Sequence, residues 1–352
     1  MSNDSRSSFY RSLFWPLLLI GVGVVFLLGN AGVIEPPSWG MLLRLWPLAL
    51  IAIGLDLLIG RRSPIIGGLL GLLVVAAVVV FLIAAPSLDL GGEAQTVIVQ
   101  EALDDAESAQ VYLDLDQYPT TIRALVDSTD LIYGELDTYG DIDLDVSGNE
   151  QVTVRLKQND PYGDGWNWDL STVDMRWEIG LTPSIPLDLS LDVGSGSAEA
   201  DISDLQLNDL FIDSGSGSVR ATLPAGDYPF ELDSGSGSVN LTFTSGLDSN
   251  MRIETGSGSV RIIFGDQSNL SIEVDSGSGS VTFELPDGVG LRLVVRDSGS
   301  GSVSPHPDMD LVDDLGDDDD DVGIWETPGY DSEEYQIEIV FGDAGSGSIN
   351  LR

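Results

Sequence analysis

The most regular set of chemically capable side chains in the sequence is a carboxylate that stands two residues before each copy of the phrase Gly-Ser-Gly-Ser. The seven copies have the carboxylates Asp192, Asp213, Asp233, Glu254, Asp275, Asp297 and Asp343. Calcium prefers several hard oxygen ligands, so a row of carboxylates is one way to bind it. An aspartate can also accept a hydrogen bond from the backbone N–H two residues further on and so form a turn. The constant spacing between acid and glycine favours this structural role, and the calcium role stays open beside it.

Two groups of residues are therefore candidate calcium ligands. The first group is Asp213, Asp233, Glu254, Asp275 and Asp297, and the second is Asp317, Asp319 and Asp321 from a run of five aspartates. The second group lacks the alternating ligand spacing of an EF-hand loop. A run of like charges is more typical of a solvated loop. Beyond Ca²⁺ the sequence indicates no cofactor.

Other catalytic chemistry has few residues to use. The chain has one histidine, His306, one lysine, Lys157, and no cysteine. This argues against serine-histidine-aspartate catalysis, histidine-rich zinc sites and Schiff-base chemistry. Glycoside hydrolysis by paired carboxylates is the one enzymatic alternative, but no pair of acids stands out. We expect a protein that is not an enzyme.

The spacing of the repeats predicts the elements that carry these side chains. The first six copies of the phrase follow one another at intervals of 20 to 22 residues, which indicates stacked structural units. Apolar residues alternate with polar ones on both sides of each phrase, for example Phe230 and Leu232 before it and Val239 and Leu241 after it. This alternation is typical of half-buried strands. We predict an all-β ectodomain, a stacked parallel β-solenoid with two strands in each rung of about 21 residues.

Charge divides the chain into two parts. Residues 1–89 carry five arginines and four acids, whereas the remaining residues carry ten basic and 53 acidic residues. The second part therefore accounts for the net charge of −42 of the whole chain. Such an acidic surface repels nucleic acid and anionic headgroups and attracts cations or basic partners. Adaptation to high salt is an alternative source of the acidity.

The first part predicts a membrane anchor with three helical spans. A duplicated hairpin occupies residues 12–60, because Trp15-Pro16-Leu17 and the residues after it recur 31 positions later from Trp46. A third apolar stretch occupies residues 64–86, and each stretch approaches the ~20 residues that a spanning helix needs. Arginines before the first span and after the second place residues 1–11 in the cytoplasm. With three spans, the acidic C-terminal part lies outside the cytoplasm in a multi-pass cell-membrane protein.

The acidic part divides further along the chain. We expect a linker at 87–93, a β-rich N-terminal cap of the solenoid at 94–190, solenoid repeats at 191–305, an acidic loop insert at 306–334 and the last rung at 335–352. A loop with two tryptophans, 160–168, is either the cover of a sheet end or a surface that stacks on sugars.

Two stretches resemble known families. The duplicated hairpin, with its Trp-Pro-Leu-x-Leu-Ile-x-x-Gly pattern, looks like the transmembrane region of LiaF-like bacterial envelope proteins. The stretch from Pro186 to Ser218 is similar to the toast-rack putative-adhesin family. These resemblances imply a membrane-anchored bacterial protein, and several relatives are tied to envelope-stress sensing alongside a histidine kinase. They imply no catalytic residues.

The expected function is non-enzymatic: envelope-stress sensing, regulation or scaffolding, with the lipid bilayer and a membrane histidine kinase or another envelope protein as partners and no nucleic acid. The alternative is a cell-surface adhesin or a Ca²⁺-dependent carbohydrate-binding module that uses the acidic residues and the tryptophan loop. Association of two copies of the chain is left open.

Overall fold

The computed structural model describes residues 95–138, 140–159, 175–315, 322–343 and 345–352, together with a few helical residues between positions 19 and 80. The chain forms two compact units, one of Met1–Glu93 with Tyr162–Asp174 and one of Ala94–Pro161 with Met175–Arg352. Most of the predicted membrane anchor, the linker 87–93, the tryptophan loop and Asp317, Asp319 and Asp321 lie outside the described residues. Within the described part of the chain, no helix combines the length and apolar character that crossing a membrane requires.

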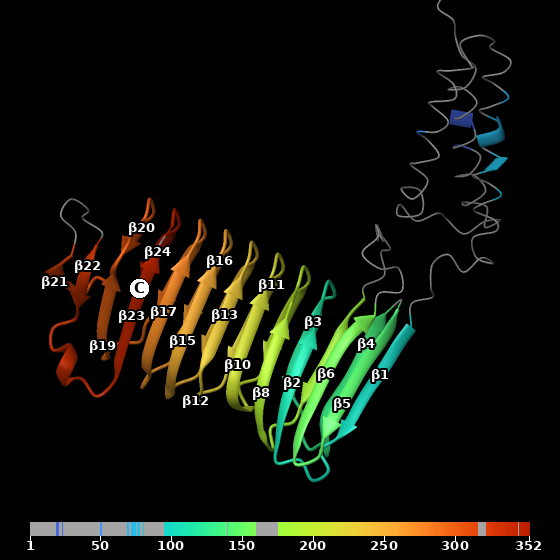
Figure 1. Cartoon of the computed structure of the whole chain (residues 1–352), viewed down its shortest axis with the longest axis horizontal. Coiled ribbons are helices and arrows are strands. Elements are labelled where there is room, and N and C mark those ends of the chain that lie inside the picture. Colours follow the sequence, from blue (N-terminus) through green and yellow to red (C-terminus); the bar gives the residue numbers. More distant parts are fainter. Residues whose placement is uncertain are drawn as a thin grey trace, which may run out of the picture. The chain divides into compact units, whose positions relative to one another are not determined.

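The second unit is built from two large β-sheets (Figure 1). In spatial order the first sheet has β1 (Gln95–Ala102), β4 (Asp130–Thr138), β7 (Trp177–Leu181), β3 (Thr120–Ala124), β9 (Ser197–Asp201), β11 (Ser218–Leu223), β14 (Ser238–Phe243), β16 (Ser259–Ile263), β18 (Ser280–Glu284), β24 (Ser348–Leu351) and β20 (Ser302–Ser304). The second has β21 (Asp310–Asp314), β22 (Gly323–Glu326), β19 (Gly290–Val295), β23 (Gln336–Asp343), β17 (Asn269–Ser276), β15 (Leu247–Thr255), β13 (Phe230–Ser234), β10 (Gln206–Ser214), β8 (Pro186–Asp192), β2 (Ser108–Asp114), β6 (Gln151–Asn159) and β5 (Asp141–Gly148), and the short β12 (Gly226–Asp227) pairs with β15.

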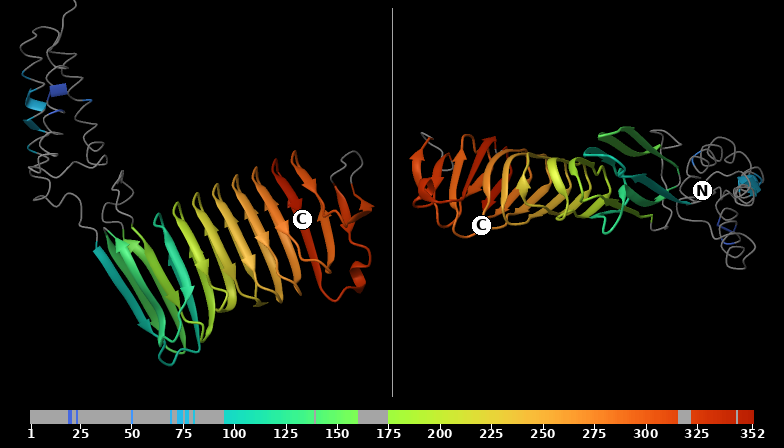
Figure 2. Two further views of the ribbon diagram at one scale, coloured as in Figure 1. Left: turned by 180° about the vertical axis from the view of Figure 1, so that it is seen from behind. Right: turned by 90° about the horizontal axis from the view of Figure 1, so that it is seen from below.

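Each repeat contributes one strand to each sheet, and we call such a pair of strands a rung. In the rung of β13 and β14, the chain runs up the second sheet, turns through the phrase that begins at Gly235, and continues into the first sheet. Neighbouring rungs pair in parallel, β13 with β10 and β15, and β14 with β11 and β16. The expected alternation of strand, bend and strand is therefore present in two parallel-rich sheets, seen from two further directions in Figure 2.

The hydrophobic core lies between the two sheets and repeats from rung to rung. Val219, Val239, Val260 and Val281 are register partners in the first sheet, and each is at most 2% exposed. Further along the chain, the rings of Phe243 at the end of β14 and Phe264 just after β16 stack with centroids 5.6 Å apart. Phe283 of β18, the register partner of Ile262, stacks on Phe264 at 6.1 Å. Because pairing is in register, equivalent apolar side chains lie above one another, and burial of each one contributes about 1.5–3 kcal/mol.

Antiparallel strands border both sheets at the N-terminal end of the stack and the second sheet at its other end. At the N-terminal end β1 pairs with β4, β4 with β7, and β5 with β6, all antiparallel. At the other end β22 pairs antiparallel with β19, and β21 with β22. The region expected as a cap also supplies a rung of its own, because β2 and β3 pair in parallel with β8 and β9 although no Gly-Ser-Gly-Ser joins them.

The rung that is last in the sequence is not last in the stack. β23 lies between β17 and β19, and β24 lies between β18 and β20, so the C-terminal rung is inserted before the rung of β19 and β20. These two rungs share one peculiarity of sequence. In most rungs the acid directly follows the last inward side chain, but here one residue stands between them, between Val295 and Asp297 and between Phe341 and Asp343. The pairing of β23 with β17 shifts by this one residue, between Val274 and Asp275 of β17. Equal spacing allows β19 and β23 to pair without a shift.

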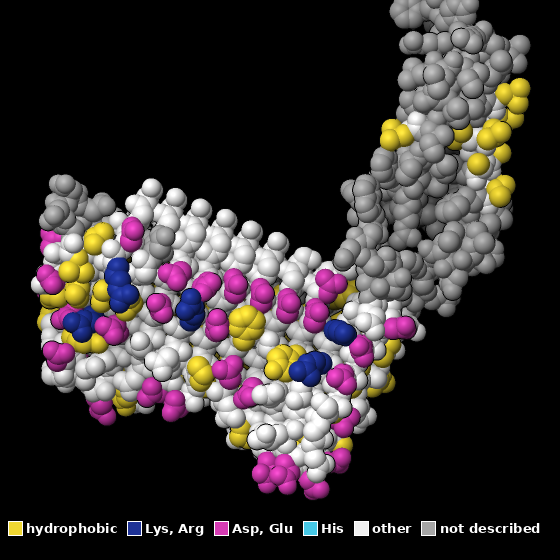
Figure 3. All heavy atoms as spheres, in the orientation of Figure 1, with side chains coloured by type: hydrophobic (Ala, Val, Ile, Leu, Met, Phe, Trp, Pro, Cys, Tyr) yellow, Lys and Arg dark blue, Asp and Glu magenta, His cyan; other side chains and the backbone are white. Residues whose placement is uncertain are grey.

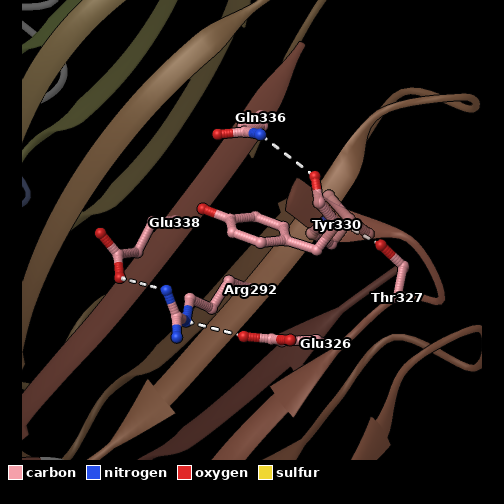
Figure 4. A network of polar contacts seen from close by, with 7 residues as sticks. Arg292, Glu326, Thr327, Tyr330, Gln336 and Glu338 are labelled. Atoms are coloured by element: carbon pink, nitrogen blue, oxygen red, sulfur yellow. Dashed lines mark hydrogen bonds and ion pairs between the residues drawn. The ribbon is translucent and has the colours of Figure 1, made fainter. Parts of the chain in front are cut away.

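The insert at 306–334, expected as a loop, contains the strand pair of β21 and β22 and the 3-10 turn η3 (Tyr330–Ser332). Arg292 of β19 fixes this insert to the stack (Figure 4). Its Nε lies 3.0 Å from Glu326 of β22 and its Nη1 lies 3.9 Å from Glu338 of β23. The guanidinium also lies over the ring of Tyr330, 5.4 Å from the ring centroid. Contacts with Glu326 and Tyr330 hold β22 and η3 of the insert against the stack.

Candidate functional site

The carboxylates before the bends form one file across the second sheet. Backbone pairing joins Asp192 to Asp213, and then in turn Asp233, Glu254, Asp275 and the backbone of Asp343. Asp114 of β2 pairs with Asp192 and so extends the file by one member that no repeat phrase announced. We call this file, from Asp114 to Asp275, the acidic row. It runs directly beneath the bends on the outer face of the sheet (Figure 3).

Closely spaced carboxylates disturb one another's ionisation. Partial burial, followed by the charges of Asp192 and Asp233, raises the pKa of Asp213 above its ordinary value of 3.8. The pKa of Asp114 is raised in the same way, by burial first and then by Asp192 and Asp116, while Lys157 opposes the shift. Burial is the larger cause of both shifts, and like charges on strands about 4.8 Å apart add to it. At Asp213 and Asp114, a cation, a proton or a basic partner would therefore offset the unfavourable neighbouring charges.

Two basic side chains moderate the row. Arg252 makes an ion pair with Glu254 at 2.8 Å within the row. Lys157, the one lysine, follows Leu156, the partner of Leu113, and therefore lies beside Asp114 at the N-terminal end of the row. Lys157 also pairs with Asp143 of β5 at 3.6 Å. Most of the row is left without such compensation in the described part of the chain.

Two of the acids, Asp192 and Asp297, accept a hydrogen bond from the first glycine of their own bend. The N–H of Gly194 donates to Asp192 Oδ1 at 3.2 Å, and the N–H of Gly299 donates to Asp297 Oδ1 at 2.8 Å. Both glycines have positive φ, 55° and 57°. In the central bends the equivalent N–H donates to the preceding rung, as Gly235 does to the carbonyl of Ser214 at 2.9 Å. The structural role predicted for the acids thus holds for Asp192 and Asp297, whereas rung-to-rung bonds replace it in the centre.

Above the acidic row, the bends line a shallow groove of about 990 Å³. Its lining consists of serines and glycines from seven successive bends. The bends are held in file by hydrogen bonds along the stack, such as Ser236 N–H to Gly215 carbonyl at 2.8 Å and Ser257 N–H to Gly235 carbonyl at 2.9 Å. The groove therefore offers hydroxyl groups and backbone polar atoms at regular spacing, and none of its lining side chains titrates near neutral pH.

The structure brings together Asp213, Asp233, Glu254 and Asp275 of the predicted calcium ligands and places Asp297 at the far end of the file of bends. Among the described residues, no group of three acids, histidines or cysteines is arranged so that it could hold a metal ion. Calcium binding stays a prediction. Sequence reasoning missed Asp114, although the pattern Val111-Tyr-Leu113-Asp114 repeats the pattern Leu189-Ser-Leu191-Asp192 and could have indicated it.

Comparison with family models identifies the parts of the chain. A model described as "LiaI-LiaF-like transmembrane region" matches residues 13–58. "N-terminal domain of toast_rack, DUF2154" matches residues 91–242, and "Toastrack DUF4097" matches residues 185–314. The chain carries a LiaI-LiaF-like transmembrane region and toast-rack domains. This toast-rack chain is accordingly a membrane protein whose transmembrane region lies near its N-terminus.

One solved structure is similar to the toast-rack chain over much of its length. It is a crystal structure of a "putative cell adhesion protein" from Clostridium sporogenes, 17% identical, with a TM-score of 0.37 over 74% of this chain and 99% of that chain. A likeness at this score carries no argument about function. No curated protein matches the toast-rack chain in sequence.

Proposed function

We propose that this chain is a non-enzymatic recognition protein of the bacterial cell envelope, with a role in stress sensing, regulation or scaffolding. The observation that carries the proposal is the long polar surface formed by the acidic row and the serine-glycine groove, in a chain that also carries a transmembrane region. A groove lined by hydroxyls and backbone has no general acid or base, so it suits contact with a partner better than bond cleavage. Resemblance to LiaF-like proteins points to a membrane histidine kinase as that partner.

In this proposal the three predicted spans form a multi-pass anchor and the stack of rungs, a β-solenoid, lies outside the cytoplasm. Protease treatment of intact cells tests the placement, because the acidic segment 308–333 offers an accessible target. Cleavage in intact cells is the expected result. Protection in intact cells, with cleavage after the membrane is opened, would place the domain in the cytoplasm.

Photocrosslinking tests the function in the full chain. A crosslinker placed in the transmembrane region 13–58 is expected to capture a membrane histidine kinase or another integral envelope protein. A matched crosslinker at Ser257, in the groove, reports on partners of the β unit. Capture of cell-wall polysaccharide at Ser257, with no protein captured from the membrane region, would contradict a sensing role.

The acidic row supports a second candidate, a Ca²⁺-dependent adhesin or carbohydrate-binding module. The pKa of Asp213 is raised first by burial and then by the charges of Asp192 and Asp233, and calcium bound to the row would offset those charges. It would raise the melting temperature of the full chain by several degrees at millimolar concentration. Magnesium serves as the control cation, since its strict octahedral geometry fits a linear row poorly. The Asp233→Asn variant is expected to lose the effect. Equal shifts with both cations would indicate charge screening and count against this candidate.

A further inference from the structure

Four hydroxyl groups are buried on the inner side of the central bends. They belong to Ser214, Ser234, Thr255 and Ser276, each of which follows a member of the acidic row and is 0%, 0%, 6% and 5% exposed, respectively. Strand alternation directs the acid outward and the next residue inward. None of the four hydroxyl oxygens has a hydrogen-bond partner among the described residues. Buried hydroxyls are normally paired, so a row of four orphaned ones calls for a ligand that supplies the bonds.

Packing does not explain the choice of hydroxyl side chains. Val193 occupies the equivalent place in the first bend and is 1% exposed, so the interior there accepts an apolar side chain. The orphaned hydroxyls also coincide with one kind of bend. Each precedes a bend whose first glycine is outside the left-handed region, whereas Gly194, Gly299 and Gly345 have φ of 55°, 57° and 53°.

The four hydroxyls repeat at a spacing that suits water. Ser214 pairs with Ser234, Ser234 with Thr255, and Thr255 with Ser276. Their side chains therefore recur at the strand separation of about 4.8 Å. If a water oxygen lies about 2.8 Å from each of two such hydroxyl oxygens, the angle between them at the water is about 120°. This is close to the angle that water prefers between its hydrogen-bond partners.

We propose that these hydroxyls and ordered water molecules alternate in one hydrogen-bonded file along the inside of the bends. Each hydroxyl donates to the water on one side and accepts from the water on the other, which satisfies its donor and one acceptor position. At Ser276 the missing side chain of Gly347 leaves space beside the hydroxyl, since a Cβ there would lie 3.0 Å from Ser276 Oγ. The ligand is neutral because the groups that face it are neutral, and the carboxylates of the row point to the opposite face.

The Thr255→Val variant of the full chain tests the file, because valine keeps the shape of threonine and removes the hydroxyl. With water bound, the substitution breaks the file and lowers the melting midpoint of the β-sheet signal by about 2–4 °C. In a dry interior it would remove an unsatisfied polar group, and the midpoint would rise or stay unchanged. Either of those two results overturns the proposal. Thr242→Val, at an exposed position of β14, is the matched control and is expected to leave the midpoint unchanged.

A crystal structure of the unmodified chain at high resolution gives a second test that does not depend on a variant's folding. Ordered water within hydrogen-bond distance of Ser234 Oγ and Thr255 Oγ1, shared between the two, is the expected result. A map without any density peak between these oxygens would overturn the proposal. The same map distinguishes water from a monovalent cation, which would show more and shorter contacts to oxygen.

Discussion

Replacing Gly237 by alanine should disrupt the stacking of the bends. Gly237 is the second glycine of its bend, and a Cβ there would overlap the carbonyl oxygen of Gly217 in the neighbouring rung. The same Cβ would also lie 2.9 Å from the carbonyl carbon of Gly217, and the backbone cannot turn away as a flexible side chain could. Because φ of Gly237 is outside the left-handed region, the penalty comes from this contact and not from the conformation of alanine.

The magnitude follows from the hydrogen bonds that the shift would weaken. To admit a methyl group, two bends must separate, which lengthens the bond from Ser238 N–H to Gly217 carbonyl, now 3.2 Å, and strains the bond from Ser259 N–H to Gly237 carbonyl, now 3.0 Å. Each bond contributes about 1 kcal/mol, and overpacking adds about 1 kcal/mol or more. We expect a loss of about 3 kcal/mol in the free energy of unfolding, or roughly 6–12 °C in the melting midpoint of a unit of this size.

Circular dichroism of the full chain in detergent, followed through the β-sheet signal, measures this midpoint. Two control variants separate the causes. Ser236→Ala lies in the same bend at an exposed position and should change stability by less than about 0.5 kcal/mol. Gly246→Ala meets no atom within 4 Å but has φ of 88°, so it isolates conformational strain of about 1 kcal/mol. A Gly237→Ala variant that melts within about 2 °C of the parent chain would refute the close stacking of the bends.

Three further predictions concern ionisation and side-chain contacts. The folded state raises the pKa of Asp213 above 3.8, so the folded chain binds this proton more tightly than the unfolded chain. The melting midpoint should therefore rise as pH falls through the folded pKa toward 3.8. Asp213→Asn should raise the midpoint at pH 7 and flatten that dependence, and the opposite slope would be contrary evidence. Arg292→Met should lower the melting midpoint by a few degrees and speed proteolysis of the insert. Arg252→Met is the control and should do neither, because the ion pair of Arg252 with Glu254 is exposed. Equal effects of the two variants would count against the role of Arg292. Tyr228→Phe removes a buried hydroxyl that donates to the Pro224 carbonyl at 2.7 Å and should cost about 1 kcal/mol by denaturant titration, and an unchanged midpoint would mean that this bond contributes nothing.

Much of the central architecture could be predicted from the repeat. The alternation around each phrase correctly assigned the inward side chains, among them Val239, Leu241 and Phe243, which are 0%, 1% and 2% exposed. The constant step between phrases predicted parallel pairing, because equal spacing places equal residues beside one another. The acidic row followed from the same step, since residues at one position of every rung must form a file.

Spatial order along the stack could not be predicted in this way. A repeat indicates that rungs are equivalent and says nothing about which rung the chain visits next, so the insertion of β23 between β17 and β19 was missed. The rung of β2 and β3 was missed because its bend, Asp116-Gln117-Tyr118, contains no glycine. The contacts of Arg292 were beyond sequence reasoning for a similar reason. They join residues 34 and 46 positions apart in sequence, which only the return of the chain through β22 and β23 brings together.

The uniform central rungs give the protein a length that can be adjusted in whole steps. Removing one complete unit, such as residues 235–255, would bring two near-identical neighbours into contact and shorten the stack by one strand spacing, about 4.8 Å. The strands that close each end of the stack would be untouched, so neither end would need a new closure. The length of this domain could thus change in evolution by the loss or gain of whole repeats, with the strand pairing of the remaining rungs preserved.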